Sequence, residues 1–65
     1  MKLDTRQISV LMAERSMTQV ELSTSCGIRP QNISTIIHRG TCSPKSAGAL
    51  AKGLGVSVAE ILRAE

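Results

Sequence analysis

Four residues in the middle of the chain, Pro30, Gln31, Asn32 and Thr35, carry side chains suited to reading the edges of DNA bases. Glutamine and asparagine amides can form paired hydrogen bonds with the adenine edge in the major groove, and a threonine methyl group suits a thymine methyl group. Proline adds a further apolar contact. Without a surrounding motif, the simpler interpretation is that these residues form only the solvated face of a helix.

Residues suited to contacting phosphate groups surround these four. Gln19 is expected at the start of a helix, where its amide and the helix dipole can both approach the DNA backbone. Any arginine or lysine among these phosphate-contact candidates can equally be a solvated surface charge, and a histidine adds positive charge only at slightly acid pH. The remaining candidates cluster around the same helix and the start of the next one: Arg29, His38, Arg39, Thr41, Ser43 and Lys45.

The charge distribution favours a polyanionic partner. The net charge is only +3, but no acidic residue occurs between Glu21 and Glu60, whereas four lysines or arginines do. So one-sided a segment is typical of a surface that binds nucleic acid, although a merely solubilising surface is also compatible with it.

Catalysis and metal binding find little support in the sequence. The carboxylates are scattered and show no paired spacing, and the chain has a single histidine and no glycine-rich phosphate loop. Two cysteines and one histidine do not make a zinc site. We therefore expect neither an enzyme nor a protein with a metal or another cofactor, and no small-molecule ligand is evident.

The elements that must position these side chains are helices, and the apolar periodicity predicts five of them and no strand. Capping boxes mark the starts of the second and fifth helices, prolines open the third and fourth, and glycines end the second and fourth. The expected helices run from residue 4 or 5 to about 15, from 18 to 27, from 30 to 38 or 39, from 43 to 55, and over a short segment after 57.

The second and third of these helices match a helix-turn-helix. Leu22, Ile33 and Ile36 are apolar and Ser23 is small, so two helices can cross closely, and Gly27 permits a tight turn between them. With Ile33, Ile36 and Ile37 directed inward, Gln31, Thr35 and His38 must point outward, with Asn32 and Arg39 beside them. This rotation exposes the residues with base-reading chemistry.

Two glycines and two cysteines have structural interpretations. Gly48 and Gly53 lie inside the fourth predicted helix, where close packing against another helix or strong tertiary contacts would justify their cost of about 1 kcal/mol each. Cys26 falls on an apolar stripe and is expected to be a small buried residue. Cys42 lies in an expected loop, where we predict an exposed thiol.

Length and composition allow one small domain. The chain has 65 residues and no aromatic side chain, so aliphatic residues must build its core. We expect a single domain over residues 1–65, with the helix-turn-helix at 18–39. The sequence shows no signal peptide or membrane span, and a reducing cytoplasm is the expected location.

The sequence resembles the Cro and phage-repressor type of helix-turn-helix regulators, often called XRE-like. The resemblance covers nearly the whole chain and rests on MTQVELS, the turn CGI, RPQNISTII, RGTCSPKSAG and LAKGLGVSVAEIL. It implies a five-helix, lambda-repressor-like fold. It also implies that Gln19 contacts a phosphate group.

Three departures from the family pattern carry predictions. A basic residue and a glutamate that often form an ion pair in the family are matched here by Met12 and Ile37, so we predict that these two side chains touch. Arg29 occupies the position where a serine or threonine usually caps the recognition helix, so this helix should lack a side-chain cap. The connection His38–Gly40 is one residue longer than usual.

Together these observations predict a transcriptional regulator that binds duplex DNA through the major groove, and we expect it to be a repressor. Two copies should bind an inverted repeat as a homodimer, associating around Val56, Val58, Leu62 and Arg63, although apolar residues there can instead close the core. Val10 and Val20, apolar where exposed polar residues are expected, support one alternative, an adaptor that binds only proteins. A second alternative is an antitoxin that binds both DNA and a toxin.

Overall fold

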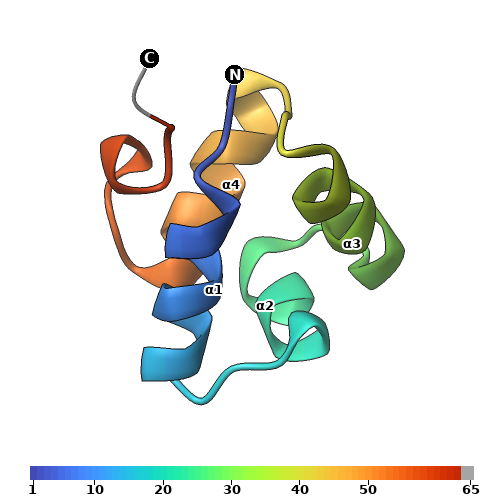
Figure 1. Ribbon diagram of the computed structural model, residues 1–65. Coiled ribbons are helices and arrows are strands. Elements are labelled where there is room, and N and C mark those ends of the chain that lie inside the picture. The colour runs from blue at the N-terminus through green and yellow to red at the C-terminus, as the bar shows by residue number, and fades with distance from the viewer. Residues whose placement is uncertain (64–65) are drawn as a thin grey trace.

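The computed structural model describes residues 1–63 and shows four α-helices and one short 3-10 turn in that range (Figure 1). The all-helical fold predicted from the sequence is confirmed, but the fifth helix is only this turn, η1. Ile61 follows η1 directly and is fully buried, and the backbone there pairs with residues near the N-terminus, so the helix cannot continue. The elements are α1 (Thr5–Glu14), α2 (Gln19–Cys26), α3 (Pro30–Arg39), α4 (Pro44–Leu54) and η1 (Val58–Glu60).

The helix starts are fixed by the capping residues that the sequence indicates. The Asp4 carboxylate accepts a hydrogen bond from the Gln7 N–H at 3.0 Å, which caps α1. Thr18 and Glu21 form a reciprocal capping box at α2, with both hydrogen bonds at 3.1 Å. Because each contact is local in sequence, these helix boundaries were predictable within a residue.

Helices α2 and α3 each end at a glycine whose backbone has the left-handed conformation. Gly27 has φ 76° and Gly40 has φ 75°, a region that a residue without a Cβ adopts at no steric cost. The chain leaves α1 differently, because Ser16 has φ 49° and is the one non-glycine residue with positive φ within residues 1–63. The turn that joins α2 to α3 therefore forms as predicted, while the turn after α1 carries some strain that the sequence did not indicate.

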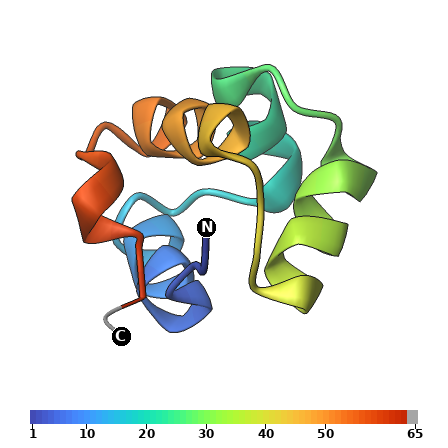
Figure 2. The same ribbon diagram turned by 90° about the horizontal axis from the view of Figure 1, so that it is seen from above.

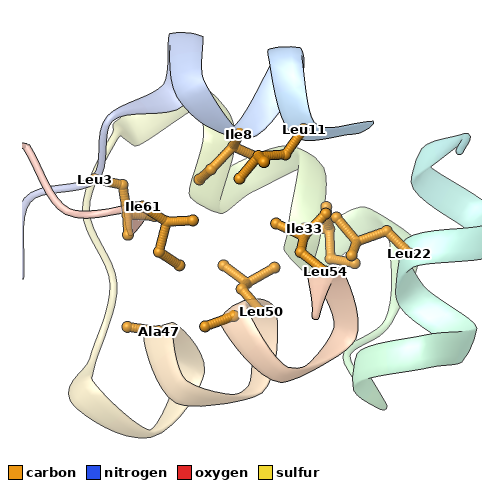
Figure 3. Packing of buried hydrophobic residues seen from close by; sticks show 10 residues of the cluster. Leu3, Ile8, Leu11, Leu22, Ile33, Ala47, Leu50, Leu54 and Ile61 are labelled. Atoms are coloured by element: carbon orange, nitrogen blue, oxygen red, sulfur yellow. The ribbon is translucent and has the colours of Figure 1, made fainter. Parts of the chain in front are cut away.

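One aliphatic core joins all four helices (Figure 3). Most of its members were expected, including Ile8, Leu22 and Ile33, each fully buried. Leu3 was not expected; it precedes the Asp4 cap by one residue and Ile8 by five, the positions of a hydrophobic staple. The buried cluster consists of Leu3, Ile8, Leu11, Leu22, Ile33, Ala47, Leu50, Ala51, Leu54 and Ile61.

The crossing of α2 with α4 leaves no space at Gly53. A Cβ atom added at Gly53 would lie 2.8 Å from the Cys26 Cβ, closer than real Cβ contacts, and 3.2 Å from the Cys26 backbone nitrogen, a tight contact. Of the two explanations for a glycine inside α4, close packing and strong tertiary contacts, close packing therefore holds for Gly53. At Gly48 an added Cβ would meet nothing within 4 Å, so packing does not explain that glycine.

The N-terminal strap, residues 1–4, lies between two segments that are distant in sequence. Leu3 donates its N–H to the Gly40 carbonyl and Asp4 donates to the Ile61 carbonyl, both at 2.8 Å. Isolated antiparallel bridges pair Lys2 with Thr41 and Leu3 with Leu62. No strand is expected from the sequence, and residues 1–63 contain none longer than these isolated bridges. The pairing of the strap with these two segments was not predicted.

The remaining predictions about packing have mixed outcomes. Met12 and Ile37 are both half-buried and pack against the core, while their mutual contact stays a prediction. Cys26 is half-buried at the α2–α4 crossing rather than fully buried. The prediction of an exposed thiol at Cys42 is wrong, because this side chain is half-buried and packs against the core. Its burial raises the pKa of the thiol above 9.0, although the N-terminal ammonium opposes the shift.

Candidate nucleic-acid interface

The inner face of α3 fixes the rotation of that helix. Ile33 is fully buried, and Ile36 and Ile37 are half-buried against the core. The opposite face is consequently directed to solvent, and Figures 1 and 2 both place α3 at one side of the molecule, away from η1. One face of α3 is locked by packing, and the other is available to a partner.

A shallow hollow runs along this exposed side of α3. It is lined by Gln31, Ser34, Thr35, His38 and Arg39, which recur at intervals of three and four residues. Four of these five were predicted site residues. Ser34 was missed, although its position three residues after Gln31 places it on the same face and was sufficient to find it.

Thr35 presents its methyl group rather than its hydroxyl proton. The Thr35 hydroxyl donates a 2.9 Å hydrogen bond to the Gln31 carbonyl one turn earlier in the helix. With the proton engaged in this way, the part of the side chain left for an outside contact is mainly apolar. This geometry agrees with the expectation that Thr35 suits a thymine methyl group.

The first turn of α3 carries the other predicted base-contact residues. Pro30 and Asn32 are exposed, as is Gln31 between them. Arg29 precedes the helix and makes no side-chain capping bond, as predicted from the departure at that position. The Asn32 and Ile33 N–H groups bond to the Arg29 carbonyl, so the Gln31 N–H is the first donor of α3 without a helical acceptor.

The start of α2 is a second exposed helix N-terminus. Gln19 is its first residue and is exposed. The Glu21 carboxylate bonds back to the Thr18 N–H in the capping box, which occupies that donor but leaves the Gln19 amide free to turn outward. The predicted phosphate contact at Gln19 is sterically open.

The loop from α3 to α4 and the start of α4 hold the other predicted phosphate contacts. Arg39, Thr41 and Lys45 are exposed and lie within seven residues of one another in sequence. The Ser43 side chain is exposed but engaged, because its hydroxyl accepts from the Ser46 N–H at 3.3 Å and donates to the Ser46 hydroxyl at 3.1 Å. A phosphate contact by Ser43 therefore requires that it release the Ser46 hydroxyl.

Every predicted site residue is exposed, and no carboxylate occurs on α3 or in the loop that follows it. Such an arrangement supports phosphate contacts at the edges and hydrogen bonds to base edges from the middle of α3.

Within residues 1–63 no group of three or more histidine, cysteine, aspartate or glutamate side chains is placed to hold a metal ion. The longest described helix, α4, has 11 residues, too few to cross a bilayer.

Comparison with known proteins gives one match. The model of the Cro/C1-type helix-turn-helix DNA-binding domain matches residues 7–65, which is most of the chain. No curated protein and no solved structure matches.

Proposed function

Because the chain belongs to the family of Cro/C1-type helix-turn-helix DNA-binding domains, we propose that it is a repressor that binds an inverted-repeat operator as a homodimer. DNA binding and transcriptional regulation are the activities of this family, which is generally not enzymatic. We propose further that residues 1–65 form a single domain. It works in the cytoplasm without a cofactor, a small-molecule ligand or catalytic activity of its own.

The outer face of α3 is the observation that carries this proposal. Gln31, Asn32 and Thr35 are exposed on a helix whose opposite side is fixed by fully buried Ile33. A recognition helix must be held rigidly so that its amides meet base edges with hydrogen-bond geometry. We propose that Pro30, Gln31, Asn32 and Thr35 contact bases.

The phosphate contacts proposed to frame this helix come from three places in the fold. They are the N-terminus of α2, the two ends of α3, and the loop and first turn that lead into α4; the residues concerned are exposed, and no acidic residue occurs between Glu21 and Glu60 in the sequence. Contacts on both sides of the major groove would fix the angle at which α3 enters it. The proposed phosphate-contacting residues are Gln19, Arg29, His38, Arg39, Thr41, Ser43 and Lys45.

Dimerisation is proposed through the C-terminal segment. Val58 and Leu62 are half-buried and Arg63 is exposed, whereas Ile61 is fully buried and belongs to the core. Figures 1 and 2 place η1 on the side of the molecule away from α3, so association there leaves α3 free. Sedimentation should detect dimers on a selected duplex; monomers both free and on DNA would exclude this part of the proposal.

The experiment that tests the function is selection of bound duplexes from a random-sequence DNA pool at near-physiological salt. We expect enrichment of an inverted repeat whose half-sites are about one helical turn apart. A single enriched half-site would keep sequence-specific binding and remove the dimer. Binding without enrichment that disappears as salt rises would leave only charge attraction and contradict the regulator proposal.

Two exposed valines favour a second candidate, an antitoxin or adaptor that binds another protein. Val10 on α1 and Val20 on α2 are 45% and 62% exposed, the largest exposed aliphatic side chains besides Met1 within residues 1–63. Single exposed valines are common on monomeric proteins, so the observation supports this candidate less than α3 supports DNA binding. A toxin-like reading frame next to the gene would favour the antitoxin, and a divergent promoter would favour the repressor.

A further inference from the structure

The N-terminal strap brings a cation to the end of α3 that no sequence signal assigns to the interface. Lys2 is paired with Thr41 by an antiparallel bridge, and Thr41 lies in the loop directly after α3. Bridge partners stand about 4.5–5.5 Å apart, and their side chains leave the backbone on the same side. We propose that Lys2 is a phosphate-contacting residue of the DNA interface, and this inference rests on the proposed function.

The strap is held firmly enough to keep Lys2 in this place. The Cys42 N–H donates to the Met1 carbonyl at 3.0 Å and the Leu3 N–H donates to the Gly40 carbonyl at 2.8 Å, so hydrogen bonds flank Lys2 on both sides. On the other edge of the strap, the Arg63 N–H donates to the Lys2 carbonyl at 3.0 Å. These are main-chain bonds, so they persist when the Lys2 side chain is changed.

Alternation along the strap directs Lys2 outward. Leu3 is 3% exposed and belongs to the core, whereas Lys2 is exposed, as expected for neighbouring residues of an extended segment. Thr41, its bridge partner, is exposed as well. Both side chains therefore stand on the surface beside the C-terminal end of α3.

Charge and spacing favour a phosphate as the ligand of Lys2. Arg39 and Lys45 lie in the same part of the surface, and the stretch of sequence that holds them, between Glu21 and Glu60, contains no acidic residue. Phosphate charges recur every 3.4 Å along one DNA strand, so side chains about 5 Å apart can contact one phosphate or two neighbouring ones. Lys2 thus extends the row of phosphate contacts that Thr41 begins.

The test is the salt dependence of binding to the selected operator and to an unrelated duplex. Lys2→Met keeps an unbranched apolar side chain and removes the charge. The slope of log K against log salt is negative, and we expect its magnitude to decrease by about 0.9 for each copy bound. Affinity for both duplexes should drop by the same factor, and Lys2→Arg should restore the slope. Urea unfolding of each variant at the same salt concentration separates a lost phosphate contact from a loss of stability.

Lys52→Met is the matched control. Lys52 is an exposed cation in the last turn of α4, at the opposite end of that helix from Lys45. An unchanged slope in Lys2→Met, or an equal decrease in Lys52→Met, would overturn the assignment of Lys2 while leaving sequence-specific binding intact. Absence of any enriched sequence in the parent protein would instead contradict the proposed function itself.

Discussion

The crossing of α2 with α4 and the outer face of α3 are opposite extremes of packing. At the crossing, Gly53 and Cys26 approach so closely that one additional carbon atom has no room. On α3, the side chains of Gln31, Ser34 and Thr35 line an open hollow and are exposed to solvent. Substitutions in the first region should therefore change stability, and substitutions in the second should change binding alone.

Leu22→Ala should have the largest effect on stability. Leu22 on α2 is fully buried, and its truncation should lower the free energy of unfolding by about 2–5 kcal/mol. Urea denaturation followed by circular dichroism measures this change. Val20→Ala on the same helix is the control, because Val20 is 62% exposed and its loss should change stability by less than about 0.5 kcal/mol. Equal effects at both positions would contradict the burial pattern of α2.

Gly53→Ala and Gly48→Ala should have opposite signs. Both replace a glycine inside α4, which by itself stabilises a helix by about 1 kcal/mol. At Gly53 the new methyl group collides with Cys26, and the resulting overpacking should make the protein less stable by about 1–3 kcal/mol. At Gly48 nothing lies within 4 Å, so the gain should be realised. A stabilised Gly53→Ala protein would show that α2 and α4 can separate easily.

Gln31→Ala should alter recognition without altering stability. If Gln31 makes a bidentate contact, its loss should remove about 1–3 kcal/mol of discrimination at one operator position and leave the salt slope unchanged. Duplex selection with the variant protein, followed by salt titration, measures both quantities. A uniform loss over all sequences would mean that Gln31 contacts phosphate.

Arg39→Ala is expected to show the reverse behaviour. Arg39 is exposed at the end of α3, and removing its charge should weaken binding to all sequences alike while reducing the salt slope by about 0.9 per bound copy. Parallel titrations of operator and unrelated DNA measure this. Relaxed preference at a single base position, with an unchanged slope, would assign base reading to Arg39.

Cys42 lies between the two extremes and should give the smallest effect. Burial raises the pKa of its thiol above 9.0, so the folded protein holds the proton more tightly than the unfolded chain. This contribution to stability is fully present below the unfolded pKa and is lost as pH rises through the folded value. As the pH rises through the range in which thiols ionise, the protein should lose slightly more stability than its Cys42→Ala variant, as measured by urea midpoints. Parallel midpoints would show that Cys42 ionises as freely as in the unfolded chain.

Local chemistry explains why so much of the fold was predictable. Asp4 and Thr18 cap the starts of α1 and α2, and Gly27 ends α2. Because each of these contacts joins residues that are close in sequence, the residue types alone predict them. The rotation of α3 followed from Ile33, and that rotation correctly predicted exposure of the outward residues. Which bases and phosphates these residues contact stays a prediction.

Long-range backbone pairing explains what was missed. The strap bonds to residues about 40 and 60 positions away through main-chain atoms, which have no side-chain signature. The same pairing ends η1 early, so the predicted fifth helix became a turn. Ser34 differs, because helical periodicity already places it on the outer face of α3, where it lines the hollow with Gln31 and Thr35.

The strap also determines which kinds of sequence change this protein can tolerate. Because main-chain atoms make its bonds, substitution at position 2 leaves the strap's hydrogen bonds in place, and the charge beside α3 can vary with that residue. Insertion of one residue is different, since side chains alternate with a period of two. An insertion between Leu3 and Asp4 would place Leu3 at the exposed position of Lys2 and the inserted residue at the buried position of Leu3. Substitution at the exposed position 2 should therefore disturb the fold less than a change in the length of the strap.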